Sequence, residues 1–306
     1  MAKRVAVLMG GWSAEREVSL SSGRECAKAL ETAGYEVIPV DVRRDLGALL
    51  TELTPGPDVI FNALHGKGGE DGVVQGVLEF LQVPYTHSGV LASALAMDKQ
   101  VAKQVMAAAG IPVPAGVVVS RDEVLRGHPI DPPYVVKPVD EGSSVGISFV
   151  MPGDNLPGLD PKSWVFGDRA LVESYVAGRE LTVAVMGDRP MAVTEIKPLA
   201  GFYDYEAKYT DGKAVHDVPA DIPAPVYEEC LRLALLAHRC LGCSGVSRAD
   251  YRYDDSRPGL EGLFMLEVNT QPGMTPLSLV PEQAAHLGIE FPELCAWMVE
   301  NAACHV

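Results

Sequence analysis

The sequence predicts an α/β fold with additional α+β elements, and three observations lead to that prediction. Short apolar runs at residues 5–9, 36–40 and 59–62 are typical of buried parallel strands. The segments between these runs repeat apolar residues with the helical period, most clearly over residues 26–33. Polar loops rich in glycine follow the first and third runs, and the carboxyl ends of strands are where α/β sheets bind ligands.

These two loops cover residues 10–17 and 63–72 and carry Glu15 and His65. Both side chains follow the carboxyl end of a strand, which makes them candidates for a ligand site. A dinucleotide-binding motif in the second loop is disfavoured, because its spacing would need a glycine where Asp71 stands. The phosphate-binding pattern G-x-x-x-x-G-K-[ST] does not occur in the sequence.

A second unit is expected beyond residue 95, where a helical stretch ends near Ala109 and turn residues become frequent. Residues 134–138 form a predicted strand that contains Lys137, and residues 146–150 form the strand that returns. The tip between them is rich in glycine and serine, which supply flexible donors suited to phosphate oxygens. We interpret the tip as a lid over phosphate, with an ordinary hairpin turn as the alternative.

Two further segments have patterns suited to a substrate site. The strand at residues 170–176 loses its pattern at Ser174, so residues 173–176 are predicted to form a hinge for a flat aromatic base. Residues 201–210 bring tyrosines, acids and a lysine together without a regular period. We interpret them as a loop that closes on substrate, with an exposed aromatic loop as the alternative.

The strand predicted at residues 263–269 carries the strongest chemical signal. Because strand side chains alternate, Leu266 and Val268 are expected to face a core, with Glu267 and Asn269 on the opposite side. Two oxygen donors on one face, followed by a turn that exposes backbone N–H groups, suit Mg²⁺ and phosphate. An amphipathic strand that runs into a turn is the plainer alternative.

A neighbouring strand at residues 245–253 places Arg248 and Asp250 on one face. If the two strands pair antiparallel, Asp250 faces Glu267 and Asn269, and opposed carboxylates repel each other unless a cation lies between them. We interpret that cation as Mg²⁺, which prefers one or two carboxylates together with phosphate oxygens. An ion pair between Asp250 and Arg248 is the alternative.

The composition narrows the classes of partner. The 306 residues, 47% of them hydrophobic, are typical of a soluble globular chain of two or three domains. No apolar run approaches the roughly 18–20 residues of a membrane span, and the N-terminus lacks a signal-peptide pattern, so we expect a cytoplasmic protein without membrane contact. A net charge of −16 repels phosphate backbones, so nucleic acid is not an expected partner.

The six cysteines are expected to be reduced thiols in a chain of this length. Cys240 and Cys243 have the spacing of a redox pair or half a zinc site, but no second Cys/His pair has metal-ligand spacing. We expect them to pack a helix end.

With these residues assembled, the sequence resembles the D-alanine–D-alanine ligase family of the ATP-grasp superfamily, nearly from end to end. The resemblance implies a three-domain ATP-grasp architecture with a Rossmann-like parallel-sheet N-terminal domain, divided into residues 1–95, 96–180 and 181–306. Its motifs are GGxSAEREVS at residues 10–19, HGxGGEDG at 65–72, MDK at 97–99, EGSSVG at 141–146, FYDYEAKY at 202–209 and ExNTxPGMT at 267–275.

That resemblance implies an activity, cofactors and partners. Two D-alanine molecules would be joined through an acyl phosphate in peptidoglycan precursor synthesis, with ATP and two Mg²⁺ ions, for which Mn²⁺ substitutes. A homodimer is also implied. The residues implied for ATP are Lys99, Lys137, Ser144, the hinge Glu173, Ser174, Tyr175 and Val176, then Glu180 for the ribose and Lys208 for the γ-phosphate. Those implied for the metal ions are Asp250, Glu267 and Asn269.

The resemblance also implies how the two substrates are held. Glu15 would bind the ammonium of the first D-alanine, with His65 nearby, and Ser143 and Tyr209 would link to Glu15 and close the site. Ser278 and the Leu279 backbone would bind the carboxylate of the second. Arg248 and the Gly273 N–H would stabilise the tetrahedral oxyanion. The sequence departs from the family's common pattern at Asp140, Ser174, Gln271, Pro276 and Leu277.

Three other functions are alternatives that the sequence allows. The first is another ATP-grasp ligase that uses D-lactate or D-serine as the acceptor. The second is a module that binds MgATP without catalysis, although Lys137, Arg248 and the metal-ligand set argue against it. The third is a Rossmann oxidoreductase, which the missing third glycine weakens.

Overall fold

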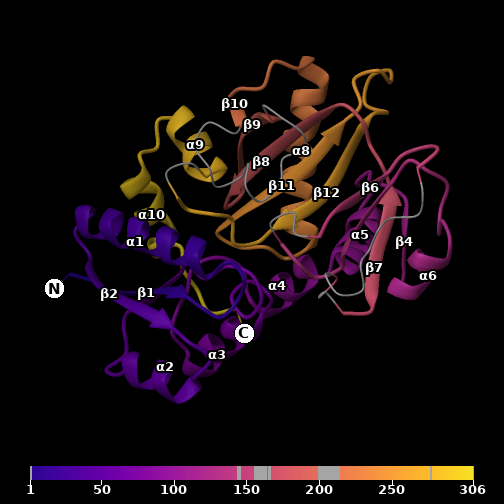
Figure 1. Ribbon diagram of the computed structural model, residues 1–306. Helices are drawn as coiled ribbons and strands as arrows, with labels where there is room; N and C mark the ends of the chain where they lie inside the picture. The colour runs from indigo at the N-terminus through magenta and orange to yellow at the C-terminus, as the bar shows by residue number, and fades with distance from the viewer. Residues whose placement is uncertain are drawn as a thin grey trace.

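The computed structural model describes residues 2–142, 146–154, 164, 167–198, 214–275 and 278–305. Its first sheet is parallel and has the strand order β2-β1-β3, with β1 in the centre (Figure 1). The predicted α/β class is therefore confirmed. The three strands are β1 (Arg4–Gly10), β2 (Glu36–Val42) and β3 (Val59–Asn62).

Helices cover both faces of this sheet. The face that carries Val5 and Val7 packs on α1 (Arg16–Thr32) and α10 (Phe291–Glu300), whereas α9 (Leu279–His286) contacts α10 and the third sheet. The face that carries Ala6 and Leu8 packs on α2 (Leu46–Glu52) and α3 (Val73–Leu81). The last helix of the chain, α10, thus returns to the first sheet and lies beside α1, as the yellow and indigo ribbons of Figure 1 show.

Helix α1 begins earlier than the apolar repeat of residues 26–33 indicates. Its first half buries Val18, Ser19, Ser22 and Gly23, which are mostly small or polar. Burial of such residues gives no hydrophobic periodicity, so the sequence pattern misses this half. The result is that the helix starts directly after Glu15.

The second sheet is antiparallel, with the order β4-β7-β5-β6. Its strands are β4 (Gly116–Ser120), β5 (Tyr134–Pro138), β6 (Ser148–Val150) and β7 (Arg169–Ser174), and α6 (Arg121–Arg126) packs beside them. The predicted pairing of β5 with a returning strand is confirmed, although that strand begins at Ser148 rather than at residue 146.

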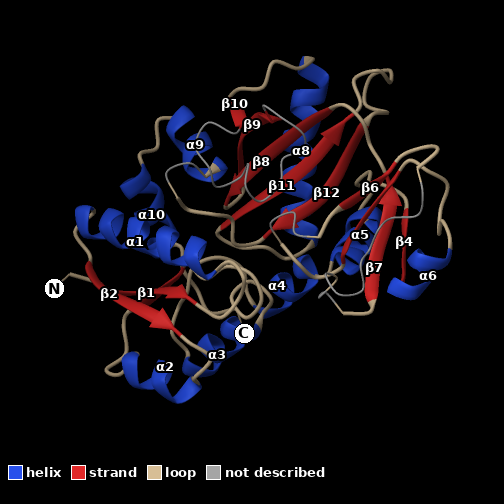
Figure 2. Ribbon diagram, viewed as in Figure 1, coloured by secondary structure: helices blue, strands red, loops and turns tan. Residues whose placement is uncertain are grey.

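The third sheet is also antiparallel, with the order β10-β9-β8-β11-β12. Its strands are β8 (Arg179–Met186), β9 (Arg189–Pro198), β10 (Ala214–Asp217), β11 (Val246–Tyr253) and β12 (Leu263–Asn269). One face packs on α8 (Ala224–Cys240) and α5 (Lys99–Ala108), which follows α4 (Val90–Met97) (Figure 2). The division of the chain at residues 95 and 180 stays a prediction.

The register of β11 and β12 decides where the polar side chains lie. Asp250 is opposite Glu267 and Arg248 is opposite Asn269, so the predicted antiparallel pairing is confirmed. The register shifts after Asp250, and Met265 and Val268 both enter the core. An irregularity of this kind breaks the alternation, so the expectation that Leu266 shares the core face with Val268 is wrong.

No helix in the described part of the chain is long and apolar enough to cross a membrane. All six cysteines are free thiols. Cys240 ends α8, and both it and Cys243 pack against the core of the third sheet, as expected. Burial raises the pKa of the Cys243 thiol to about 12, which favours an inert thiol over a redox or zinc ligand.

Candidate active site

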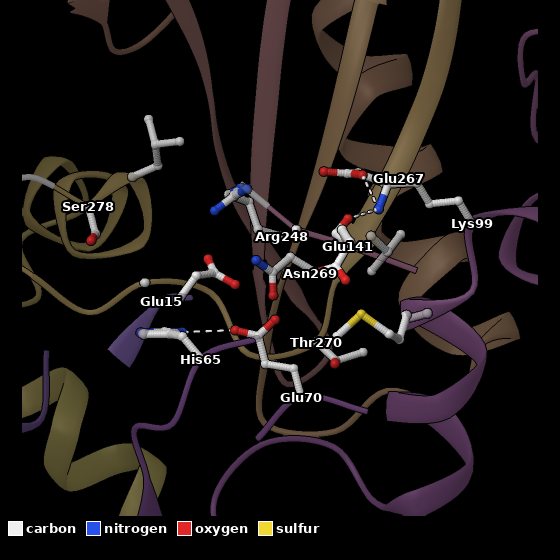
Figure 3. Close-up of a pocket in the computed structure, with 16 residues that line it drawn as sticks. Glu15, His65, Glu70, Lys99, Glu141, Arg248, Glu267, Asn269, Thr270 and Ser278 are labelled. Atoms are coloured by element: carbon white, nitrogen blue, oxygen red, sulfur yellow. Dashed lines mark hydrogen bonds and ion pairs between the residues drawn. The ribbon is translucent and has the colours of Figure 1, made fainter. Parts of the chain in front are cut away.

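A cleft opens where the loops of the first sheet meet the ends of β11 and β12 (Figure 3). It encloses about 920 Å³ of empty space, part of which is open to solvent. Nine of the residues proposed from the sequence line this cleft, although they come from opposite ends of the chain. They are Glu15, His65, Lys99, Arg248, Glu267, Asn269, Gly273, Ser278 and Leu279.

Glu15 is held at the N-terminus of α1 by the loop that precedes it. The Ser13 hydroxyl donates to the His65 carbonyl (2.6 Å) and accepts from the Glu15 backbone N–H (3.1 Å), so it ties the loops after β1 and β3 together. Gly66 packs against the Glu15 side chain with φ +71°. A Cβ at Gly66 would lie 2.7 Å from Oε2 of Glu15. The loop therefore needs glycine at this position, because a side chain would clash with Glu15 and because the positive φ disfavours other residues.

The His65 ring is fixed at both nitrogens. Nδ1 lies 2.9 Å from Oε1 of Glu70, and Nε2 lies 3.1 Å from the Ser22 hydroxyl. The His65 side chain is almost fully buried, so its orientation is set before any ligand binds. Ser22 itself is buried within α1, which makes it a support for the ring and not a nucleophile.

Lys99 begins α5, and its ammonium joins two walls of the cleft. It donates to the Glu141 carbonyl at 2.5 Å and lies 3.5 Å from Oε2 of Glu267. The Asp98 carboxylate caps the same helix by accepting from the N–H groups of Gln100 and Val101. A capped helix start therefore places a cation beside the carboxylate of β12.

Lys67 connects the loop after β3 to the loop after β5. Its ammonium lies 2.6 Å from Oε1 of Glu141 and 3.3 Å from Oδ2 of Asp140. Glu141 also lines the cleft, and Gly142 lies against the Glu15 carboxylate. The start of the glycine- and serine-rich segment is thus held over Glu15.

Arg248 and Asp250 form the ion pair that the sequence left open as an alternative to a metal site. The guanidinium makes two bonds to the carboxylate, at 2.8 and 2.7 Å, and the Thr182 hydroxyl donates to the same carboxylate at 2.7 Å. Arg248 lines the cleft, whereas Asp250 is not among its lining residues. Asp250 therefore holds the Arg248 guanidinium at the cleft wall in this state.

Oxygen donors gather in the cleft, although the described residues contain no group of three Asp, Glu, His or Cys side chains that could hold a metal ion on its own. Glu15, Glu70, Glu141 and Glu267 supply four carboxylates to its lining, against the permanent cations of Lys99 and Arg248. The Asn269 side-chain oxygen accepts from the Gln271 N–H at 2.9 Å, which orients it next to Glu267. An excess of carboxylates with an amide oxygen suits Mg²⁺.

The turn after β12 leads into the N-terminus of α9. The Ser278 hydroxyl accepts from the Thr275 N–H at 2.9 Å, and a Cβ at Gly273 would lie 2.9 Å from that hydroxyl. Ser278 and Leu279 both line the cleft at the start of the helix. A helix N-terminus with exposed N–H groups favours a carboxylate.

The residues assigned to adenine and ribose lie outside this cleft lining. The Ser174 and Tyr175 N–H groups donate to the Ala115 and Pro133 carbonyls, so backbone contacts shape the hinge. Arg252, which sequence reasoning missed, donates to the Val176 carbonyl at 3.1 Å. It also lies 3.6 Å from the Glu180 carboxylate, and thereby joins the hinge to the proposed ribose ligand.

Lys137 and Glu173 meet on adjacent strands of the second sheet. The Lys137 ammonium contacts Oε1 of Glu173, and both side chains are buried. Burial lowers the pKa of Lys137 to about 8, and repulsion from Lys99 acts in the same direction against attraction to Glu267. Lys99 and Glu267 both line the cleft, so the charges of the cleft act on Lys137.

Four predicted site residues, Ser143, Ser144, Lys208 and Tyr209, lie outside the described residues. Several supporting residues were missed, most of them because they act through a partner distant in sequence. They are Ser13, Ser22, Lys67, Glu70, Lys103 and Arg252. Ser13 and Glu70 did have a sequence signal, since they stand in the same short motifs as Glu15 and His65.

Two family models and several relatives match this chain. A family model described as D-ala D-ala ligase C-terminus matches residues 105–300, and one described as D-ala D-ala ligase N-terminus matches residues 4–55 and 47–88. A D-alanine–D-alanine ligase of Cereibacter sphaeroides is 61% identical over 303 residues, which are 99% of this chain and 96% of the relative. One of Acidiphilium cryptum is 57% identical over 99% of this chain and 100% of the relative.

A solved structure gives the same result for the fold. The crystal structure of D-alanine–D-alanine ligase from Bacillus anthracis complexed with ATP superimposes with a TM-score of 0.80 at 32% identity. It covers 98% of this chain and 97% of that chain.

Proposed function

Because the chain belongs to the D-alanine–D-alanine ligase family, we propose that it joins two D-alanine molecules at the expense of ATP, for peptidoglycan synthesis. The observation that carries this proposal is the single cleft that unites Glu15, Arg248, Glu267 and Ser278. These residues supply an ammonium ligand, an oxyanion ligand, a metal ligand and a carboxylate site. We place the reaction in the cytoplasm because it consumes ATP.

The reaction divides into two steps. A carboxylate oxygen of the first D-alanine attacks the γ-phosphorus of ATP, which gives an acyl phosphate and ADP. The amine of the second D-alanine then attacks the acyl carbon, loses a proton, and phosphate leaves as the peptide bond forms. Glu15 holds the first ammonium, and the Arg248 guanidinium and the Gly273 N–H stabilise the oxyanion.

Glu267 and Asn269 would hold Mg²⁺, or Mn²⁺ in its place, at the end of β12. Asp250 is the third proposed ligand, and we propose two ions as the family resemblance implies. The metal supplies charge neutralisation for phosphoryl transfer when it is bound. Lys99 and Lys137 add positive charge that the protein, at −16 overall, otherwise lacks.

The proposal predicts strict substrate dependence. With MgATP, D-alanine should release ADP and yield a dipeptide, whereas L-alanine should not. A coupled ADP assay with product identification by mass spectrometry checks this. Mixtures of D-alanine with D-lactate or D-serine test the alternative acceptors, and a depsipeptide or mixed dipeptide as the main product would replace the proposal. ATP binding without turnover would contradict it.

We also propose that the protein is a homodimer, through an apolar patch on α3 and α4. Val73 and Phe80 are seven residues apart and therefore lie on one face of α3, with 56% and 89% of their surface exposed. Val90 and Leu91 add apolar surface at the start of α4, which contacts α3. Exposed apolar surface of this kind is typical of an interface.

Phe80→Glu is expected to convert the dimer to a monomer, because a charge in the core of an apolar interface is strongly disfavoured. Multi-angle light scattering after size exclusion measures the mass. Leu260→Glu is the matched control, since Leu260 is also exposed but lies in the turn between β11 and β12. A monomeric wild type, or a Phe80→Glu variant that remains dimeric, would rule out this interface.

A further inference from the structure

Lys103 is a buried cation to which the proposed reaction gives no role. It lies on α5 one turn after Lys99, with 7% of its surface exposed. Its ammonium donates to Oε2 of Glu173, while Lys137 contacts Oε1 of the same carboxylate. One buried carboxylate at the end of β7 therefore has a different lysine on each oxygen.

The charges in this cluster do not balance. Lys103 and Lys137 share Glu173, and burial lowers the pKa of both lysines. Lys99 repels both of them and Glu267 attracts both. Among the residues that the structure describes, three lysines thus face two carboxylates in this cluster, and a buried excess of positive charge is unfavourable until an anion compensates it.

We propose that Lys103 is a positioning residue for ATP, because it neutralises Glu173 and leaves the charge of Lys137 available to the nucleotide phosphates. This inference rests on the proposed assignment of Lys137 to those phosphates. Without Lys103, the Glu173 carboxylate would have Lys137 as its cation in this cluster. The Lys137 ammonium would then be compensated before ATP arrives.

The three side chains come from three elements, which explains how the arrangement is kept. Lys103 is on α5, Lys137 on β5 and Glu173 on β7, and the two strands are adjacent in the second sheet. Since α5 also carries Lys99 into the cleft, one helix supplies a cation to the cleft and a counter-ion to the hinge. A purely structural tie would need no second lysine on Glu173.

The test separates phosphate binding from binding of the nucleoside. Calorimetric dissociation constants for ADP and adenosine are measured on the full chain for wild type, Lys103→Gln and Lys103→Arg. Lys103→Gln should weaken ADP about tenfold, as loss of one nearby charge predicts, and change adenosine less than about twofold. Lys103→Arg keeps the charge and should stay near wild type, as should Lys28→Gln, which removes an exposed lysine.

Each other outcome has a defined meaning. Equal weakening of ADP and adenosine by Lys103→Gln, or no weakening, would overturn the proposal. Lys137→Gln is measured in parallel: if its ADP affinity equals that of wild type, the phosphate assignment of Lys137 fails as well. Should Lys103→Gln not fold, the double variant with Glu173→Gln removes both charges. In this double variant, the affinity for ADP divided by the affinity for adenosine should equal the wild-type ratio. A ratio lower than that of wild type would overturn the proposal.

Discussion

Glu267→Gln is expected to lower kcat by at least about 100-fold while the fold is retained. The substitution keeps the size of the side chain but removes the negative charge that would hold the metal at the end of β12. A metal ion contributes several kcal/mol to a phosphoryl transition state, and about 1.4 kcal/mol corresponds to a tenfold change in rate. The loss should be smaller at high Mg²⁺ concentration, because mass action partly restores occupancy.

Stability should change little in this variant. The Glu267 side chain is 29% exposed and its ammonium partner on Lys99 lies 3.5 Å away, so the ion pair contributes little to folding. The coupled ADP assay over a range of Mg²⁺ gives the rate, and a melting curve gives the stability. Glu229→Gln removes a carboxylate that pairs with Arg232 on α8 and serves as the control. Wild-type turnover in Glu267→Gln would exclude the metal assignment.

The regular elements of this fold are largely visible in the sequence. Strands β3, β5 and β12 have the predicted limits because each is a short apolar or alternating run with clear ends. The irregularity beside Asp250 could not be read from residue types, since it depends on how two strands pair. For that reason Leu266 was misplaced although its neighbours Glu267 and Asn269 were paired correctly.

The residues of the site likewise divide into those that the sequence predicts and those that it does not. Glu15 could be proposed from its place after a strand, and Arg248 and Glu267 from strand alternation; the resemblance to a known family then implied their roles, and the cleft brings all three together. Residues that act through a partner far along the chain carry no such signal. Lys103, for example, is 70 residues from Glu173, and a single lysine in a helix is ordinarily a solvated surface residue.

Arg248→Lys is expected to lower kcat by about 10²–10³-fold, which is typical for loss of one oxyanion ligand. The Arg248 guanidinium makes two bonds to Asp250 and lines the cleft, so its planar fork fixes where the charge lies. A lysine ammonium keeps the charge but cannot make two parallel bonds to one carboxylate. The charge would therefore be placed less accurately against the developing oxyanion.

The measurement for Arg248→Lys must separate chemistry from nucleotide binding. Because Arg248 is assigned to the oxyanion, kcat should fall while the dissociation constant for ADP stays within about twofold of wild type. Arg232→Lys is the matched control, since Arg232 makes the same two-bond pair with Glu229 on the exposed side of α8. A variant that weakens ADP binding and kcat together would place Arg248 on the nucleotide instead. In that case the Asp250 pair would serve phosphate binding, and the oxyanion would depend on the Gly273 N–H at the turn after β12.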